Sequence, residues 1–346
     1  MTDNAASRRE SAGGGGLLQG ARRLLMQREI GIFVIAVVLF FYFQFTNQGF
    51  WSQSNLTTLS QTVAPYVIMA TGLVMVMILG EIDLSVGSTF GFAPIIMWLA
   101  YADLRLILPI SVAIGLLACA AVGLVNGVVH VYFRVPSFVV TLGTFFLLGG
   151  LNVILLNGFP KNAPGGTVQQ WLGSYPYSEI VWAFIIFVMM HLLLKNTRWG
   201  MHTFATGGNL IGAREAGIRV NRIRIVNFMI CAVLAGFAGI LEAMRVGSID
   251  PLAGGANTMF LAISAGVIGG TALTGGVGTM IGAFLGSVVL AELRQGFTLL
   301  GVNANTFDVI LGVAILILMI FNIYLGTVRE RGGFRWFSRP EKKGST

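Results

Sequence analysis

The chain has 346 residues, of which 55% are hydrophobic and only 10% are charged, and its mean hydropathy is +0.80. A soluble domain carries about 25% charged residues, so this composition excludes an ordinary soluble enzyme. The net charge of +8 does not indicate nucleic-acid binding, because the sequence contains neither aromatic-basic interleaving nor zinc-finger spacing. The composition predicts an all-α fold, that of a polytopic integral membrane protein.

Apolar segments long enough to cross a membrane follow one another from residue 30 onward. A helix needs about 20 apolar residues to cross about 30 Å of hydrocarbon, and the alternating segments of a membrane barrel are absent. Residues 1–29 are expected to be a disordered cytoplasmic tail, residues 30–326 the transmembrane domain and residues 327–346 a basic cytoplasmic tail. We predict about ten spans, at residues 30–46, 61–80, 84–101, 106–130, 137–157, 180–195, 225–246, 257–273, 276–293 and 306–325.

Basic residues are concentrated in three places. Of the 22 lysines and arginines, 17 lie in the N-terminal tail, in Lys195–Arg224 and in the tail from Arg329. Alternation of the spans puts these three segments on one side of the membrane. The positive-inside rule then predicts that both termini are cytoplasmic. Three of the loops expected on the outside contain only Lys161 between them: Asn47–Ser60, Gly158–Ser178 and Gly247–Ala256.

Two pairs of predicted spans are separated by Gly/Ser/Thr-rich stretches instead of polar loops. Gly80–Ser88 joins the second and third spans, and Gly269–Thr279 joins the eighth and ninth. Interrupted segments in corresponding halves of a membrane protein indicate a transport pathway. The two stretches resemble each other, which predicts two interrupted-helix halves as a weak internal repeat. The alternative reading at each glycine is close helix packing.

Ionisable residues are costly within spans, so they mark candidate functional positions. Glu242 can pair with Arg245 about one helical turn away. Glu292 can lie at the membrane interface beside Arg294, and Asp308 can cap the last span. Asp83 lies in the first Gly-rich stretch with Glu81 beside it, and we predict that Asp83 either lines the pathway or holds the stretch together.

Motifs for intrinsic catalysis are absent from the sequence. It contains no P-loop, no H-E-x-x-H, no G-x-S-x-G elbow and no Cys/His cluster. We therefore expect no catalytic residue, no metal site and no cofactor in this chain.

The cytoplasmic segment 196–224 contains a predicted short helix. Asn209 can cap its N-terminus and Gly217 can end it at about Ala216. Such a helix between two spans could serve as a docking surface for a peripheral motor. The alternative is an ordinary charged connection that only sets the topology.

Four segments that occur in order along the chain carry a family resemblance. They are GEIDLSVGS at Gly80–Ser88, VPSFVVTLGT at Val135–Thr144, GNLIGAREAGI at Gly208–Ile218 and VIGGTALTGGVGT at Val267–Thr279. Together they resemble the permease subunits of bacterial ATP-binding-cassette (ABC) sugar importers of the ribose/xylose/arabinose type. One departure is Glu81, because the family usually has glycine at that position.

The resemblance implies a multi-subunit machine in the bacterial inner membrane. Separate ATPase subunits, which carry ATP and Mg, would dock on the cytoplasmic face. A second permease chain, identical or paralogous, would complete the pathway, and an extracytoplasmic binding protein would deliver a monosaccharide or polyol. The candidate pathway residues are Glu81, Asp83, Ser85, Asn126, Thr141, Thr271 and Thr274. The candidate ATPase-coupling residues are Gly208, Asn209, Ala213, Arg214, Gly217 and Ile218.

Rival functions remain open at this point. The same kind of machine could import a nucleoside or a furanose autoinducer. A stand-alone secondary transporter or channel would move its substrate without an ATPase, but the scarcity of membrane-embedded carboxylates counts against ion coupling. A membrane enzyme is disfavoured by the missing catalytic motifs.

Overall fold

The computed structural model describes residues 28–303 and scattered positions between 306 and 320. Within them, seven helices are long and apolar enough to cross a membrane, and two shorter apolar helices, α4 and α12, accompany them. This confirms the all-α polytopic fold. The predicted tails and the predicted tenth span, with Asp308, lie largely or wholly outside the described residues.

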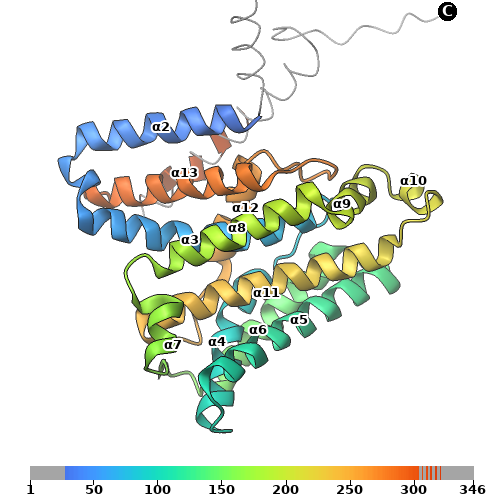
Figure 1. The fold of residues 1–346 in the computed structure, drawn as a ribbon, viewed down its shortest axis with the longest axis horizontal. Coiled ribbons are helices and arrows are strands. Elements are labelled where there is room, and N and C mark those ends of the chain that lie inside the picture. The colour runs from blue at the N-terminus through green and yellow to red at the C-terminus, as the bar shows by residue number, and fades with distance from the viewer. Residues whose placement is uncertain are drawn as a thin grey trace, which may run out of the picture.

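Figure 1 shows the long helices running roughly parallel, with α2 and α13 at one edge of the bundle and α5 at the other. Two two-residue strands pair antiparallel, a small addition to the predicted all-helical fold. The elements are α2 (Arg28–Thr46), η1 (Gln48–Trp51), α3 (Gln53–Met77), α4 (Val86–Ala102), α5 (Leu108–Tyr132), α6 (Ser137–Leu155), β1 (Lys161–Asn162), α7 (Thr167–Gln169), η2 (Gln170–Ser174), α8 (Ser178–Asn196), α9 (Arg198–Gly208), α10 (Leu210–Glu215), α11 (Val220–Val246), β2 (Ser248–Ile249), α12 (Gly255–Ile268) and α13 (Met280–Leu299).

Helix α11 occupies the centre of the bundle and packs along α3, α4 and α5. Glycines let these helices approach closely. A Cβ atom on Gly123 of α5 would lie 2.5 Å from the carbonyl oxygen of Phe228, and one on Gly239 of α11 would lie 1.8 Å from that of Phe90. Gly123 and Gly239 therefore permit the close packing of α11 against α5 and α4.

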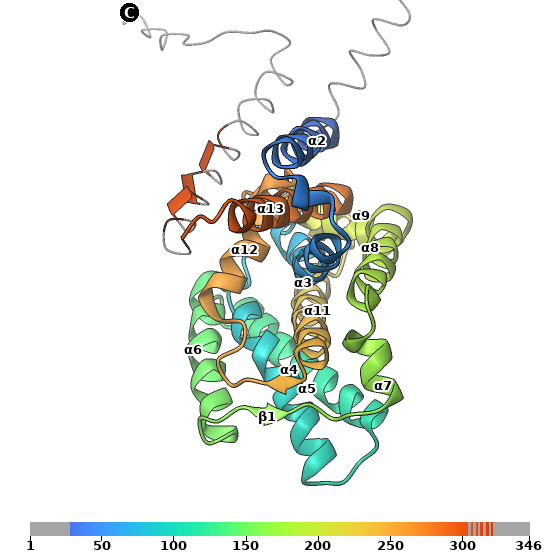
Figure 2. The same cartoon turned by 90° about the vertical axis from the view of Figure 1, so that its left-hand side faces the viewer.

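The connections gather at two ends of the bundle, which we call the β1 end and the α10 end. At the β1 end, seen from the front in Figure 2, β1 pairs with β2. The Gln53 side chain there donates to the Tyr177 hydroxyl at 2.6 Å. The loops expected to share the outer side thus do share one end, while α9 and α10 lie at the other end (Figure 1).

The two Gly-rich stretches form matching interruptions, which we call the first break (residues 78–85) and the second break (residues 269–279). Gly80, with φ +76°, donates to the Met77 carbonyl three residues back. Gly270, with φ +87°, donates to the Val267 carbonyl in the same way. In both breaks the next residue donates five residues back, which completes a Schellman motif. This shared geometry supports the predicted internal repeat.

Candidate functional site

Asp83 is fully buried in the first break and organises a chain of hydrogen bonds. Its Oδ1 accepts from the Ser85 backbone N–H at 2.9 Å and from the Ser85 hydroxyl at 2.5 Å. The Asn126 amide donates to Ser85 Oγ at 2.9 Å, and the Thr144 hydroxyl donates to Asn126 Oδ1 at 2.6 Å. These bonds tie the start of α4 to α5 and α6, as expected of a residue that holds the break together.

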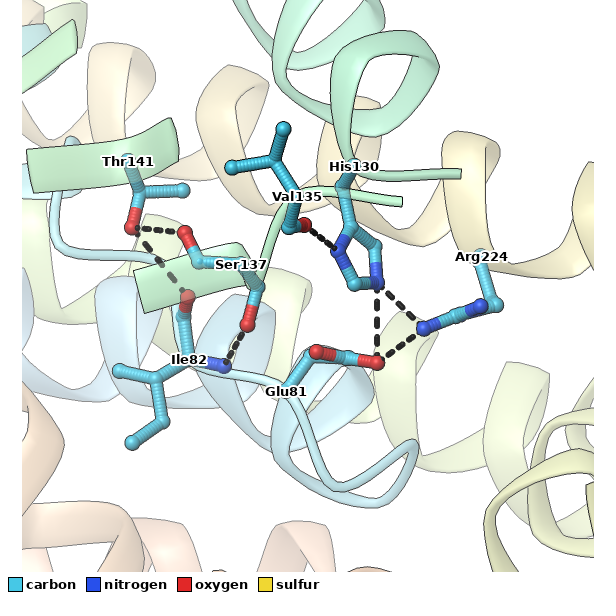
Figure 3. Close-up of polar contacts among 7 residues, drawn as sticks. All are labelled: Glu81, Ile82, His130, Val135, Ser137, Thr141 and Arg224. Atoms are coloured by element: carbon cyan, nitrogen blue, oxygen red, sulfur yellow. Dashed lines mark hydrogen bonds and ion pairs between the residues drawn. The ribbon is translucent and has the colours of Figure 1, made fainter. Parts of the chain in front are cut away.

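The extended backbone of the first break rests on the start of α6. The Ile82 N–H donates to Ser137 Oγ, and the Thr141 hydroxyl donates to the Ile82 carbonyl, both at 3.3 Å. Figure 3 shows both contacts beside the side chain of Glu81. Five of the predicted pathway residues, Glu81, Asp83, Ser85, Asn126 and Thr141, therefore lie in one polar cluster at the α10 end.

Glu81 binds two basic side chains from distant segments (Figure 3). His130 Nε2, at the end of α5, lies 2.9 Å from Glu81 Oε1, and Arg224, near the start of α11, pairs with the same oxygen and contacts His130 Nε2. His130 Nδ1 lies 2.7 Å from the Val135 carbonyl. Because a carbonyl only accepts, Nδ1 carries the hydrogen in this contact. Three elements are thus joined around one carboxylate.

Glu81 lies between the spans, and its surroundings favour the charged form. Burial raises the pKa of Glu81, but hydrogen bonds from His130, Ser137 and Arg224 outweigh burial, so that the pKa lies below its ordinary value. Glu81 is therefore an anion that fastens the first break to α5 and α11.

The second break lies directly against the first. The Gly276 N–H donates to the Ile78 carbonyl at 2.7 Å, and a Cβ atom on Gly80 would lie 3.3 Å from the Thr274 carbonyl oxygen. The two breaks therefore contact each other, and the contact is made by backbone atoms. Of the two pathway candidates here, Thr271 is buried and Thr274 is exposed.

The predicted short helix exists as α10. Asn209 Oδ1 accepts from the Gly212 N–H at 2.9 Å, and Gly217, with φ +81°, follows the helix. Leu210, Ile211 and Arg214 are exposed, whereas Ala213 is buried. Of the other coupling candidates, Gly208 is exposed at the end of α9 and Ile218 is half-buried. Helix α10 lies at the end of the bundle (Figure 1), and its exposed residues Leu210, Ile211 and Arg214 are available there for a contact.

Two membrane carboxylates were assigned partners from sequence. Glu242 pairs with Arg245, as predicted. The Glu292 side chain is buried within the turn Val289–Leu293 of α13, whereas Arg294, beside it in sequence, is exposed; the place of Glu292 at the membrane interface stays a prediction.

Sequence reasoning missed His130, Thr144 and Arg224 as members of the cluster around the first break. No role was predicted for His130 or Thr144, and Arg224 was noted only as the end of the basic segment Lys195–Arg224. A usable signal was present, because alternation of the spans puts His130 and Arg224 on the same side as the acidic first break.

The comparisons with known proteins agree with this architecture. Residues 55–319 match the family described as branched-chain amino acid transport system / permease component. The chain belongs to this permease family. It is 38% identical over 86% of its length to a xylose/arabinose import permease protein of Sulfolobus acidocaldarius, covering 85% of that protein.

Other relatives extend the range of named substrates within the permease family. The chain is 33% identical to the ribose import permease protein of Escherichia coli, covering 79% of this chain and 86% of the relative. It is also 33% identical to an autoinducer 2 import system permease protein of Photorhabdus luminescens, covering 85% and 89%. No solved structure matches the chain.

Proposed function

We propose that this permease is the membrane subunit of an ABC importer for a monosaccharide or a related small polyol. The observation that carries the proposal is the identity of 33–38%, over most of both chains, to permeases named for xylose/arabinose, ribose and autoinducer 2 import. The family description also names branched-chain amino acids, but these relatives make an oxygen-rich substrate the better candidate.

In this proposal the α10 end faces the cytoplasm and the β1 end faces outward. Lys195–Arg224, the basic segment that carries α9 and α10, supports this orientation through the positive-inside rule. A cysteine in place of Arg214 should then react with a membrane-impermeant maleimide only in inside-out vesicles. Strong labelling in intact cells would show that the α10 end faces outward, contrary to the proposal.

The chain itself is a non-catalytic subunit in the proposed machine, and its motor is a pair of separate ATPase subunits that dock on α10. Closure of the ATPase pair would move α9 and α10. This motion would reach the two breaks, because Gly207 of α9 makes a close backbone contact with Ile78 of the first break. Localisation in the bacterial cytoplasmic membrane, a second permease chain and an extracytoplasmic binding protein complete the proposal.

Gentle solubilisation of the native membrane tests the assembly. A tagged copy of the chain should bring down an ABC ATPase, and a substrate-loaded binding protein should raise ATP hydrolysis by that preparation. Recovery of the chain alone, with ion-driven transport in liposomes, would favour a stand-alone secondary transporter. If the accompanying binding protein carries a nucleoside or a furanose autoinducer, the chain is still the permease of an ABC importer, but its substrate is not the proposed monosaccharide or polyol.

A further inference from the structure

An apolar groove of about 480 Å³ lies at the β1 end, where η2 meets the first turns of α8. We propose that this groove binds an acyl chain of a membrane lipid from the bilayer leaflet at the β1 end. The proposal goes beyond the transport function, because it concerns the surface that the chain turns toward the bilayer and not the transported molecule. The residues that carry the argument are Trp171, Tyr175, Val181, Trp182 and Ile185.

The chemistry of the groove favours a hydrocarbon ligand. None of the described residues that line the groove carries an ionised side chain. The nearby carboxylate, Glu179, is buried and turned into the bundle, where one of its oxygens lies 3.2 Å from Arg245 Nε. A sugar or a charged peptide would leave water for this groove without finding new hydrogen bonds, whereas a hydrocarbon chain gains by leaving water.

The walls of the groove are fixed by contacts of their own. The Trp182 indole N–H donates to the Trp171 carbonyl at 3.0 Å, and the Trp182 ring meets the ring of Phe237 on α11 edge-on at 5.5 Å. The rings of Trp171 and Tyr175 also meet edge-on, at 5.9 Å. The groove is therefore formed before a ligand enters it, so that binding does not require these side chains to become ordered.

The groove lies at the depth at which a lipid chain begins. Tryptophan and tyrosine are enriched where the hydrocarbon meets the headgroups, and Trp171, Tyr175 and Trp182 lie together at this end of α8. Their polar N–H and O–H groups suit the headgroup level, while their rings suit the hydrocarbon below it. A chain that enters beside them is a lipid chain of the same leaflet.

An exposed apolar stripe continues from the groove along α8. Helix α8 lies at the edge of the bundle (Figure 2). Val181 and Ile185 are followed on the same helix face by Val188 and Leu192, and all four are exposed. The rise from Val181 to Leu192 is about 16 Å, which is roughly half of the hydrocarbon thickness. The groove and the stripe together therefore offer a continuous apolar path as deep as one leaflet.

The experiment uses the full chain, purified with any subunits that it retains, in vesicles of phosphatidylethanolamine and phosphatidylglycerol. A trace of phosphatidylcholine with a diazirine in the middle of one acyl chain is the probe. After photolysis, mass spectrometry should find the label on the segment from Trp171 to Ile185. Val181→Trp fills the groove and should lower this labelling about tenfold, the loss expected when about two methylene groups are no longer buried.

Two further variants make the photolabelling specific. Ile185→Trp fills the groove from the next turn of α8 and should act like Val181→Trp; both positions are exposed, so both variants should fold. The matched control is Met189→Trp, because Met189 is 50% exposed and Val181 is 54% exposed, but Met189 lies outside the groove. Labelling of the segment should be unchanged in this control.

Three outcomes would overturn the lipid site. Equal labelling of the wild type and both groove variants would show that lipid only covers this surface. An equal loss of labelling in Met189→Trp would show that the groove itself is not the site. A disulfide-linked dimer of Ile185→Cys in oxidised membranes would show that a second permease chain occupies the groove instead. Each of these results would leave the importer function standing.

Discussion

Asp83 and Glu81 lie two residues apart in the first break, yet their surroundings differ. Asp83 is enclosed and bonds to its own local turn through Ser85, whereas Glu81 reaches outward to His130 and Arg224. The first arrangement shapes the break, and the second fastens it to neighbouring helices. Their substitutions should therefore have different consequences.

Replacing Asp83 tests the local turn. Asp83→Asn keeps an oxygen that can accept from Ser85 but weakens both bonds, at a cost of about 1 kcal/mol. Asp83→Ala leaves the Ser85 N–H without an acceptor and costs about 1–3 kcal/mol. Transport by the assembled complex should fall in the order wild type, Asn, Ala, while Asp103→Asn, at an exposed position of the β1 end, should leave it unchanged. Wild-type transport by a normally abundant Asp83→Ala complex would refute a role as gate or scaffold.

Replacing Glu81 tests the ion-paired cluster through its pH dependence. Glu81→Gln should lower the free energy of unfolding by about 1.5–3 kcal/mol at pH 7, because charge-assisted bonds to His130 and Arg224 are lost. The pKa of Glu81 is lowered by folding. The stabilisation is therefore fully present above the ordinary carboxyl pKa and is lost as pH falls through the folded pKa.

Thermal unfolding of the purified chain across a pH series gives the readout for Glu81. The gap between wild type and Glu81→Gln should be constant at neutral pH and should close under acid conditions. A gap that is absent at pH 7, or that widens on acidification, would contradict the assignment.

At the level of elements, the short helix and the breaks could be predicted from sequence because their signals are local. Asn209 and Gly217 stand at cap positions that depend only on spacing. The clustering of Glu81 with His130 and Arg224 could not be predicted from spacing, because it depends on how α5 and α11 pack.

The contact between α9 and the first break can be tested with adjacent glycines. A Cβ atom on Gly207 would lie 1.7 Å from the Ile78 carbonyl oxygen, whereas one on Gly208 would meet nothing within 4 Å. Gly207→Ala should destabilise the chain by about 1–3 kcal/mol through overpacking, and Gly208→Ala should stay within about 0.5 kcal/mol of wild type. Equal unfolding midpoints for the two variants would show that α9 does not press on the break.

The exposed face of α10 can be tested with a pair of matched apolar residues. Ile211 on α10 and Leu252 at the β1 end are 71% and 75% exposed. Ile211→Asp should abolish co-purification of the ATPase, because the charge would face an apolar contact, while Leu252→Asp should leave it intact. This pair of variants tests docking more directly than bulky substitutions at Ala213 or Gly217. Ala213 is buried and Gly217 has a left-handed backbone, so a bulky residue at either position would disrupt α10 itself. Retention of the ATPase by the Ile211→Asp variant would show that the docking surface does not include the exposed face of α10.

For the whole molecule, composition and charge were enough to predict the fold class and which loops share an end. The boundaries were less accurate where helices end inside the bundle: α12 stops at Ile268, earlier than the predicted 273, because Gly270 closes it with a Schellman motif. Helix α3 begins at Gln53 instead of 61, because polar residues there can still continue a helix beyond the apolar core. Hydropathy therefore predicts the apolar part of a helix, whereas α3 continues beyond its apolar part into polar residues.

The central claim is that this permease moves a sugar only when a separate ATPase drives it. The most direct measurement is uptake of radiolabelled D-xylose, L-arabinose and D-ribose into proteoliposomes that contain the chain alone or the chain with its ATPase. The binding protein is supplied outside and ATP is enclosed. The account predicts uptake of at least one of these sugars by the complete complex, and none by the chain alone under a proton or sodium gradient. Gradient-driven uptake by the chain alone would contradict it.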